Sequence, residues 1–138
     1  MRRLNVRAAQ LDSCIKNRRF ALATQPQRPK LFPGEILLLD LVLEDALTLG
    51  KKDSRIEWVL LFNNYQRDSD GSKSKLYWPH EGRIWSWILV CSEARRVERP
   101  FSLENLGLSQ DYWGQDNGRL ISSADEKIIM LYISGSKI

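Results

Sequence analysis

Cysteine and histidine are scarce in this chain of 138 residues, and their scarcity excludes several kinds of site. Cys14 and Cys91 stand far apart without a CxxC pair, and His80 is the single histidine. Zinc sites take three or four ligands drawn mainly from these residue types, so the sequence predicts no metal and no cofactor. We expect both thiols to be reduced, as in a cytoplasmic protein.

The sequence motifs of common enzymes are also missing. The chain contains no GxSxG elbow, no phosphate loop ending in GKS or GKT, and no HExxH. Asp125-Glu126-Lys127 contains the Asp-x-Lys pattern of metal nucleases, but at a predicted helix start rather than on a strand. His80 stands in a polar loop, which is more typical of a surface histidine than of a general base. The sequence therefore predicts no catalytic residues, and we expect the protein not to be an enzyme.

Long apolar segments are absent as well. The longest run, ILLLDLVL at 36–43, contains Asp40 and is far too short to cross a bilayer. Residues 1–24 break every apolar stretch with Arg, Asn, Gln or Asp, which is unlike a secretory signal. These features predict no membrane partner.

The composition that remains is that of one globular domain, which we assign to residues 1–138. Hydrophobic residues make up 43% and charged residues 28%, and a chain of this length buries about two-thirds of its unfolded surface. The formal net charge of +4 is compatible with a polyanionic partner without requiring one.

The hydrophobic pattern predicts an α+β fold in which helices flank one strongly curved, mostly antiparallel sheet. Prolines and glycines separate the segments, and 66–75 has no apolar residue, which is typical of an exposed loop. Ser102 is expected to begin a short helix, and Ser122 or Ser123 a terminal one. The other predicted elements are a helix at 5–18 and strands at 18–24, 35–45, 55–65 and 83–93.

Five tryptophans and several clusters of basic residues carry the functional prediction. Trp85 and Trp87 share one face of their strand, where core packing is the simplest role, whereas Trp78 and Trp113 stand in polar, glycine-rich segments expected at a rim. Each basic cluster alone is typical of a solvated surface. Interleaved aromatic and basic residues favour nucleic-acid binding, because rings stack on bases while Arg and Lys pair with phosphates.

Three segments resemble the PUA-like superfamily, and within it the EVE and YTH group of modified-base readers: FALATQPQRPKLFPGEILLLDLV, RIEWVLLF and IWSWILVCSEARRVERPFSLENL. The resemblance covers about residues 18 to 110. It rests on the Pro33-Gly34-Glu35 turn before the strand from Ile36, on the tryptophan strand at 84–91, and on the VERPFSLENL exit. SRA and ASCH domains share the turn.

This resemblance implies a small barrel that takes a flipped or unpaired modified base into an aromatic pocket. It also implies a nuclease or motor domain or subunit as partner, as in modification-dependent restriction systems. We therefore expect a reader of a modified base in DNA; the alternatives are an RNA-binding PUA-like or ASCH-like domain and a protein-interaction domain. The predicted base-binding residues are Trp58, Trp78, Trp87, Trp113, Asp40 and Asn63, and the predicted phosphate-binding residues are Arg18, Arg19, Arg28, Lys30, Arg95 and Arg96.

Overall fold

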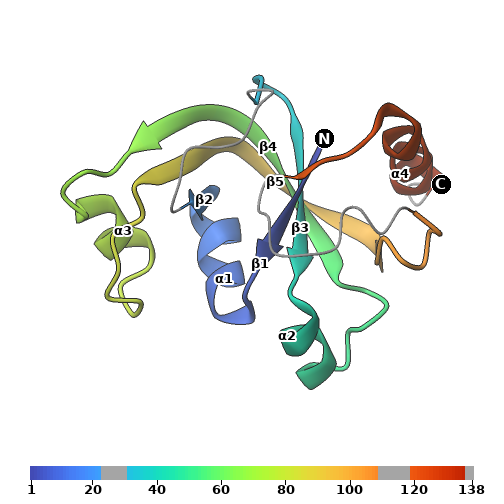
Figure 1. The fold of residues 1–138 in the computed structure, drawn as a ribbon, viewed down its shortest axis with the longest axis horizontal. Coiled ribbons are helices and arrows are strands. Elements are labelled where there is room, and N and C mark those ends of the chain that lie inside the picture. The colour runs from blue at the N-terminus through green and yellow to red at the C-terminus, as the bar shows by residue number, and fades with distance from the viewer. Residues whose placement is uncertain (23–30, 109–118, 136–138) are drawn as a thin grey trace.

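The structure is a computed structural model that describes residues 1–22, 31–108 and 119–135, and it confirms the α+β class. Figure 1 shows α3 at one end of the molecule and α4 at the other, with two long strands arching between them. In chain order the elements are β1 (Arg2–Val6), α1 (Ala8–Asn17), β2 (Arg19–Leu22), β3 (Ile36–Leu41), α2 (Leu43–Thr48), β4 (Ile56–Arg67), α3 (Ser72–Tyr77), β5 (Trp87–Phe101), β6 (Arg119–Leu120) and α4 (Ser123–Gly135).

The strands form one mixed sheet in the order β2-β5-β4-β3-β1-β6. Among the described strands, β1 and β3 alone pair in parallel; the other pairings are antiparallel, as expected. β4 and β5 are bent by three register shifts, which increase local twist. Across the described strands the sheet is open, with β2 and β6 at its edges, so the predicted barrel is not confirmed.

Both faces of the sheet are covered. Leu37 and Leu39 of β3 belong to one buried cluster with Phe62 and Trp78, whereas Leu38 between them belongs to a second cluster with Ile129 of α4. Successive strand residues point to opposite faces, and both faces meet apolar partners here. This explains the continuous aliphatic run of β3, which is typical of a doubly covered strand.

The N-terminus differs from the prediction. The helix expected at 5–18 begins at Ala8, and the residues before it form β1, inside the sheet. Arg2 and Arg3 in this strand are buried, with Arg2 3.4 Å from Glu35 and Arg3 3.8 Å from Asp40. Buried charges need such partners, and the sequence alone does not reveal them.

Two predicted strands have different ends. The strand expected to reach residue 45 ends at Leu41, and α2 follows, where the Asp45 carboxylate accepts a hydrogen bond from the Ala8 amide at 2.8 Å. The strand expected at 83–93 begins at Trp87 and continues to Phe101. The basic segment 94–99 is therefore strand rather than turn, since it pairs with β4 in part.

Two helices also need correction. α3 occupies part of the predicted loop at 66–75, and the segment after Ser102 is a series of turns rather than a helix, although the Ser102 hydroxyl accepts the Asn105 amide at 3.2 Å. The terminal helix is confirmed as α4, with the Ser122 hydroxyl accepting the Asp125 amide at 3.3 Å. None of the helices in the described ranges is long and apolar enough to cross a membrane.

Candidate nucleic-acid interface

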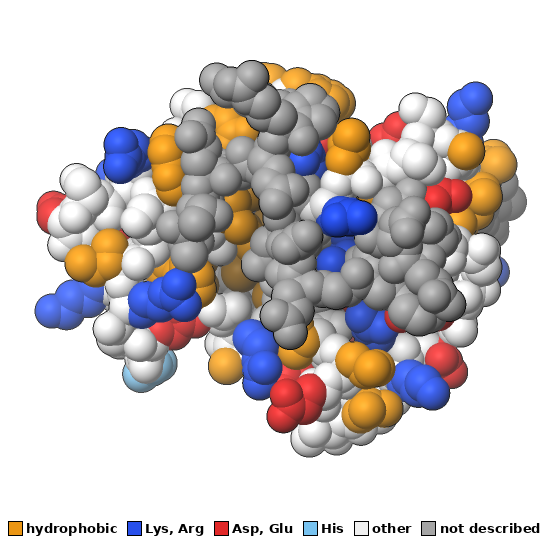
Figure 2. All heavy atoms as spheres, viewed as in Figure 1, with side chains coloured by type: hydrophobic (Ala, Val, Ile, Leu, Met, Phe, Trp, Pro, Cys, Tyr) orange, Lys and Arg blue, Asp and Glu red, His pale blue; other side chains and the backbone are white. Residues whose placement is uncertain are grey.

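Three guanidinium groups lie over aromatic rings at the α3 end of the sheet. Their central carbons lie 5.0 Å (Arg67 to Trp87), 3.9 Å (Arg83 to Trp85) and 5.6 Å (Arg19 to Tyr77) from the ring centres. We call these six residues the arginine–aromatic cluster. All three rings are half-buried, so each keeps contact with solvent. Figure 2 shows Lys and Arg side chains at this end, on the left.

Hydrogen bonds hold the Trp85 part of the cluster in place. The Asp68 carboxylate accepts the Ser74 hydroxyl at 2.6 Å, and the same hydroxyl oxygen accepts the Trp85 amide at 2.8 Å. The indole N–H of Trp85 donates to Glu81 at 2.7 Å, and Gln10 of α1 donates to the other oxygen of that carboxylate. Ser74 of α3 thus holds the backbone of Trp85, while Glu81, itself held by α1, holds the indole.

Asp68 acts as a structural anion in this scaffold. Burial alone would raise the pKa of its carboxyl, but hydrogen bonds from the side chain and amide of Ser74 and from the Lys73 amide outweigh burial and lower the pKa. The carboxylate therefore stays charged at neutral pH while it orders the first turn of α3. This buried contact lies inside the segment that the sequence predicts to be an exposed loop.

Trp78 is a core residue, and its predicted place at a rim is wrong. Its side chain is 4% exposed, and its ring lies 5.8 Å from that of Tyr77 at 73°. At the end of α3, the Trp78 amide donates to the Ser74 carbonyl at 2.8 Å, and the side chain belongs to the buried cluster of Phe62. The indole interacts with Cys14, and burial raises the pKa of that thiol to about 12.

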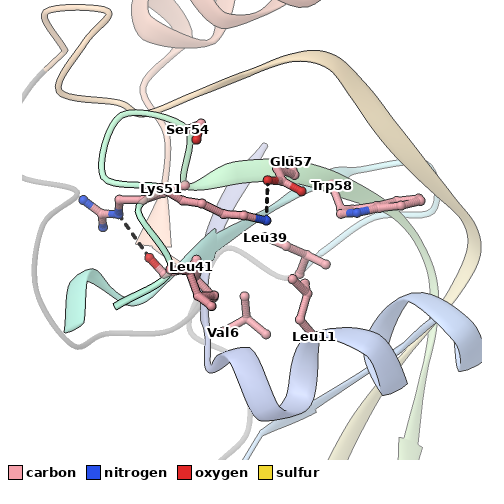
Figure 3. A pocket seen from close by; sticks show the side chains of 10 residues that line it. Val6, Leu11, Leu39, Leu41, Lys51, Ser54, Glu57 and Trp58 are labelled. Atoms are coloured by element: carbon pink, nitrogen blue, oxygen red, sulfur yellow. Dashed lines mark hydrogen bonds and ion pairs between the residues drawn. The ribbon is translucent and has the colours of Figure 1, made fainter. Parts of the chain in front are cut away.

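Trp58 lines a pocket that is too small for a base. The pocket lies between α1 and the sheet, beside Leu39 and Leu41, and Lys51 extends across it to pair with Glu57 at 2.8 Å (Figure 3). Its volume is about 30 Å³, the space of about one water molecule, whereas ligand pockets typically measure roughly 300–1,000 Å³. Trp58 is half-buried, so packing accounts for its position.

Asp40 is enclosed by arginines, which is at odds with the predicted contact to a base. Its side chain lies 3.2 Å from Arg55 and 3.8 Å from Arg3, and Arg55 also pairs with Glu104 at 2.7 Å. Burial raises the pKa of Asp40 to about 6, although both arginines oppose the increase. At 3% exposure this carboxyl joins elements of the fold.

The remaining predicted residues are not gathered in one place. Asn63 is exposed on β4, and the exposed Arg18 donates to the Ser92 carbonyl at 3.4 Å. Arg95 and Arg96 stand on β5, eight and nine residues from Trp87, which corresponds to about 26–30 Å of strand. Three predicted residues lie outside the described ranges: Trp113, Arg28 and Lys30.

Sequence reasoning did not include four members of the cluster among the predicted binding residues: Arg67, Arg83, Tyr77 and Trp85. Arg83 and Trp85 are two residues apart, a spacing that brings side chains to one side of an extended chain and that could have indicated their contact. Arg67 and Trp87 face each other across β4 and β5. Because this pair depends on strand register, no local pattern in the sequence indicates it.

Comparison with protein-family models, curated proteins and solved structures finds no significant match to this chain. In the described ranges, no group of three or more His, Cys, Asp or Glu side chains is arranged to hold a metal ion. The chemical groups that the cluster offers to a ligand are thus guanidinium donors and ring faces.

Proposed function

We propose that this chain binds nucleic acid through the arginine–aromatic cluster and reads a modified base in DNA. The supporting observation is the set of three guanidiniums over half-buried rings at one end of the sheet. Nucleic-acid binding without extensive base readout needs these two elements, since cations neutralise phosphates and rings stack on bases. The net charge of +4 has the appropriate sign.

The PUA-like resemblance, with its small barrel, belongs to this proposal. The tight turn before β3 supports this part of the proposal. The Glu35 amide donates to the Phe32 carbonyl at 3.0 Å, and Gly34 has φ +90°, a value that side-chain-bearing residues rarely adopt. A curved, mostly antiparallel sheet with flanking helices is compatible with such a fold.

Magnitudes favour a base over a guanidinium as the partner of the solvent-facing side of each half-buried ring. A cation–π contact at an exposed site contributes about 0.5–1 kcal/mol, whereas stacking of a base on an aromatic side chain contributes about 1–3 kcal/mol. An incoming base therefore displaces Arg67 or Arg83 from its ring. The released guanidinium then pairs with a flanking phosphate, so one displacement makes both contacts.

Preference for a modified base comes from the rings rather than from the arginines. A methyl group brought against an indole buries apolar area worth about 0.8 kcal/mol, or roughly fourfold in affinity. Phosphate contacts carry no information about the base edge, so they leave this ratio unchanged. The proposal therefore predicts a modest preference that depends on Trp85 and Trp87.

The test is a fluorescence-anisotropy titration at low salt with labelled single-stranded and duplex DNA and RNA of one sequence. The DNA carries cytosine, 5-methylcytosine, 5-hydroxymethylcytosine or N6-methyladenine. We expect the double variant R67Q/R83Q to weaken binding about tenfold and to lower the slope of log affinity against log salt by about 1.4–1.8. Replacing Trp85 or Trp87 by Leu should abolish the preference for a modified base.

Arg99→Gln is the matched control, because Arg99 also covers a ring, that of Tyr132 at 5.1 Å, but at the α4 end. It should weaken binding less than twofold. If R99Q loses as much DNA affinity as R67Q and R83Q do singly, the loss reflects net charge alone. That result would overturn the assignment of binding to the cluster. Tighter binding to RNA than to all of the DNA probes would overturn the proposal that the ligand is DNA.

A further inference from the structure

A second candidate binding site lies on the other side of the sheet, between α4 and strands β3, β4 and β5. This groove has a volume of about 290 Å³, close to the lower limit of ordinary ligand sites. The strands and α4 contribute a mostly apolar lining: Ile36, Val59, Leu61, Val97, Met130 and Ile133. Figure 1 shows α4 at the opposite end of the molecule from α3.

The groove lies beside the contacts that hold α4 on the sheet. Ile129 is fully buried, and the Tyr132 ring lies 5.1 Å from that of Phe101. Ile133, one helical turn after Ile129, packs partly against the same cluster, and together with Met130 it lines the space above Val59 without filling it. Apolar walls on two sides leave a slot that favours an apolar group of about ten heavy atoms, if each takes roughly the volume of a water molecule.

Charged side chains of β5 stand at this groove. The Arg95 guanidinium is engaged by Glu93 through two hydrogen bonds of 2.8 and 3.0 Å. Arg96 forms no ion pair within the described ranges, and its planar fork of donors suits a carboxylate or a phosphate. Glu98 also lines the groove. Its negative charge repels an anionic ligand, whereas the positive charge of Arg96 attracts it.

We propose that this groove binds a small amphiphilic anion, with its apolar body between α4 and the sheet and its charged group on Arg96. The site is separate from the arginine–aromatic cluster, since Val59 belongs to the apolar cluster of α4 while Trp87 packs against the other one. The inference therefore goes beyond the proposed function and does not depend on nucleic-acid binding.

The test compares octanoate with octylammonium, two probes that share a chain and differ in charge, by NMR titration of the whole chain. Octanoate should shift the methyl signals of Val59 and Leu61 and bind at least about fivefold more tightly than octylammonium, which corresponds to about 1 kcal/mol. Arg96→Gln should weaken octanoate binding about fivefold. Glu98→Gln should strengthen it about twofold, because it removes the opposing charge.

Ser134→Trp tests the location without touching the core, because Ser134 is exposed and lines the groove. It should block octanoate, whereas Leu131→Ser, on an exposed residue that does not line the groove, should leave binding unchanged. Equal affinity for the two probes, or loss of binding in Leu131→Ser but not in Ser134→Trp, would overturn the proposal. So would a stable dimer in sedimentation that excludes octanoate.

Discussion

The two ends of the sheet keep side chains available to ligands in different ways. At the α3 end, aromatic rings are half-buried under guanidiniums, and Trp85 is fixed by a chain of hydrogen bonds that runs from Asp68 through Ser74. At the α4 end, apolar side chains surround a space that the helix does not fill. At the α3 end, polar contacts hold a ring outside the core. At the α4 end, incomplete packing of the helix on the sheet leaves a groove.

The same residue types have different roles at the two ends. Arg67 and Arg83 lie over rings without an ion pair among the described residues, so a phosphate can engage them. Arg95 is already paired with Glu93. In the proposal, nucleic acid contacts the α3 end, so removal of the charge of Arg95 or Arg99 at the other end should have little effect on nucleic-acid binding.

The largest expected effect is on the free energy of unfolding, and it distinguishes a tryptophan in the core from one in the cluster. Trp78→Ala should lower the free energy of unfolding by about 3–5 kcal/mol, because it empties a buried site, whereas Trp85→Ala should cost about 1–2 kcal/mol for a half-buried ring and its hydrogen bond. Urea unfolding measures both values. Equal decreases in the free energy of unfolding would mean that Trp85 is a core residue. The arginine–aromatic cluster would then lack one of the rings proposed to stack on a base.

The next effect concerns Asp40, whose ion pairs lie between the two ends. Its folded pKa of about 6 lies above the unfolded value of about 3.9, so the folded state holds more protons between these values and stability falls as pH rises through that window. Asp40→Asn removes this titration. The free energy of unfolding of the wild type minus that of D40N should therefore decrease by on the order of 2 kcal/mol from pH 4 to pH 7.

A constant difference between the wild type and D40N across this range would show that Asp40 is not held in a desolvated site. The comparison is made with D40N rather than with D40A because the amide keeps the shape of the carboxyl next to Arg3 and Arg55. Chemical unfolding at closely spaced pH values supplies both curves.

A smaller effect tests the scaffold of the cluster. Asp68→Asn keeps one acceptor for α3 and loses the charge, so it should destabilise the protein by about 1 kcal/mol at pH 7. Because the folded pKa of Asp68 is lowered, its contribution is present above the unfolded value of about 3.9 and is lost as pH falls below it. Wild type and D68N should therefore converge near pH 2.

If thermal melts show the same gap between wild type and D68N at pH 7 and at pH 2, the Asp68 carboxylate is not the group that orders α3. An independent check is the near-ultraviolet circular dichroism of D68N, which should report a less ordered Trp85.

The smallest effect is expected at the α4 end. Leu131→Ser changes a side chain that is 74% exposed, so the free energy of unfolding should change by less than about 0.5 kcal/mol. A cost above 1 kcal/mol would show that Leu131 is covered, for example by a second copy of the chain, and the sedimentation coefficient of the wild type would reveal such a dimer.

The sequence predicted the α+β class, because its aliphatic runs and turn residues reflect local preferences. The strand from Ile36 is the clearest case, since a run that is apolar on both faces fits few other structures. β1 was missed because Arg2 and Arg3 resemble surface residues until Glu35 and Asp40 are brought to them. Pairing between distant segments creates that environment, and periodicity carries no information about it.

Prediction of the candidate site was less successful for a similar reason. Trp78 was expected at a rim because it stands in a polar, glycine-rich segment, yet Asp68 orders the preceding residues as α3 and Trp78 is buried. The residues that now define the arginine–aromatic cluster meet through strand register, as Arg67 and Trp87 do, and through the position of α3, which carries Tyr77. Of the residues predicted from the sequence, Trp87 and Arg19 belong to it.

The most direct measurement of the central claim is an NMR titration of the tryptophan indole N–H signals with single-stranded DNA that contains one 5-methylcytosine. The five signals are assigned by single Trp→Phe variants. We expect the signals of Trp85 and Trp87 to shift, and those of Trp58 and Trp78 to stay in place. Shifts confined to Trp58, or the absence of any shift at low salt, would contradict nucleic-acid binding at the arginine–aromatic cluster.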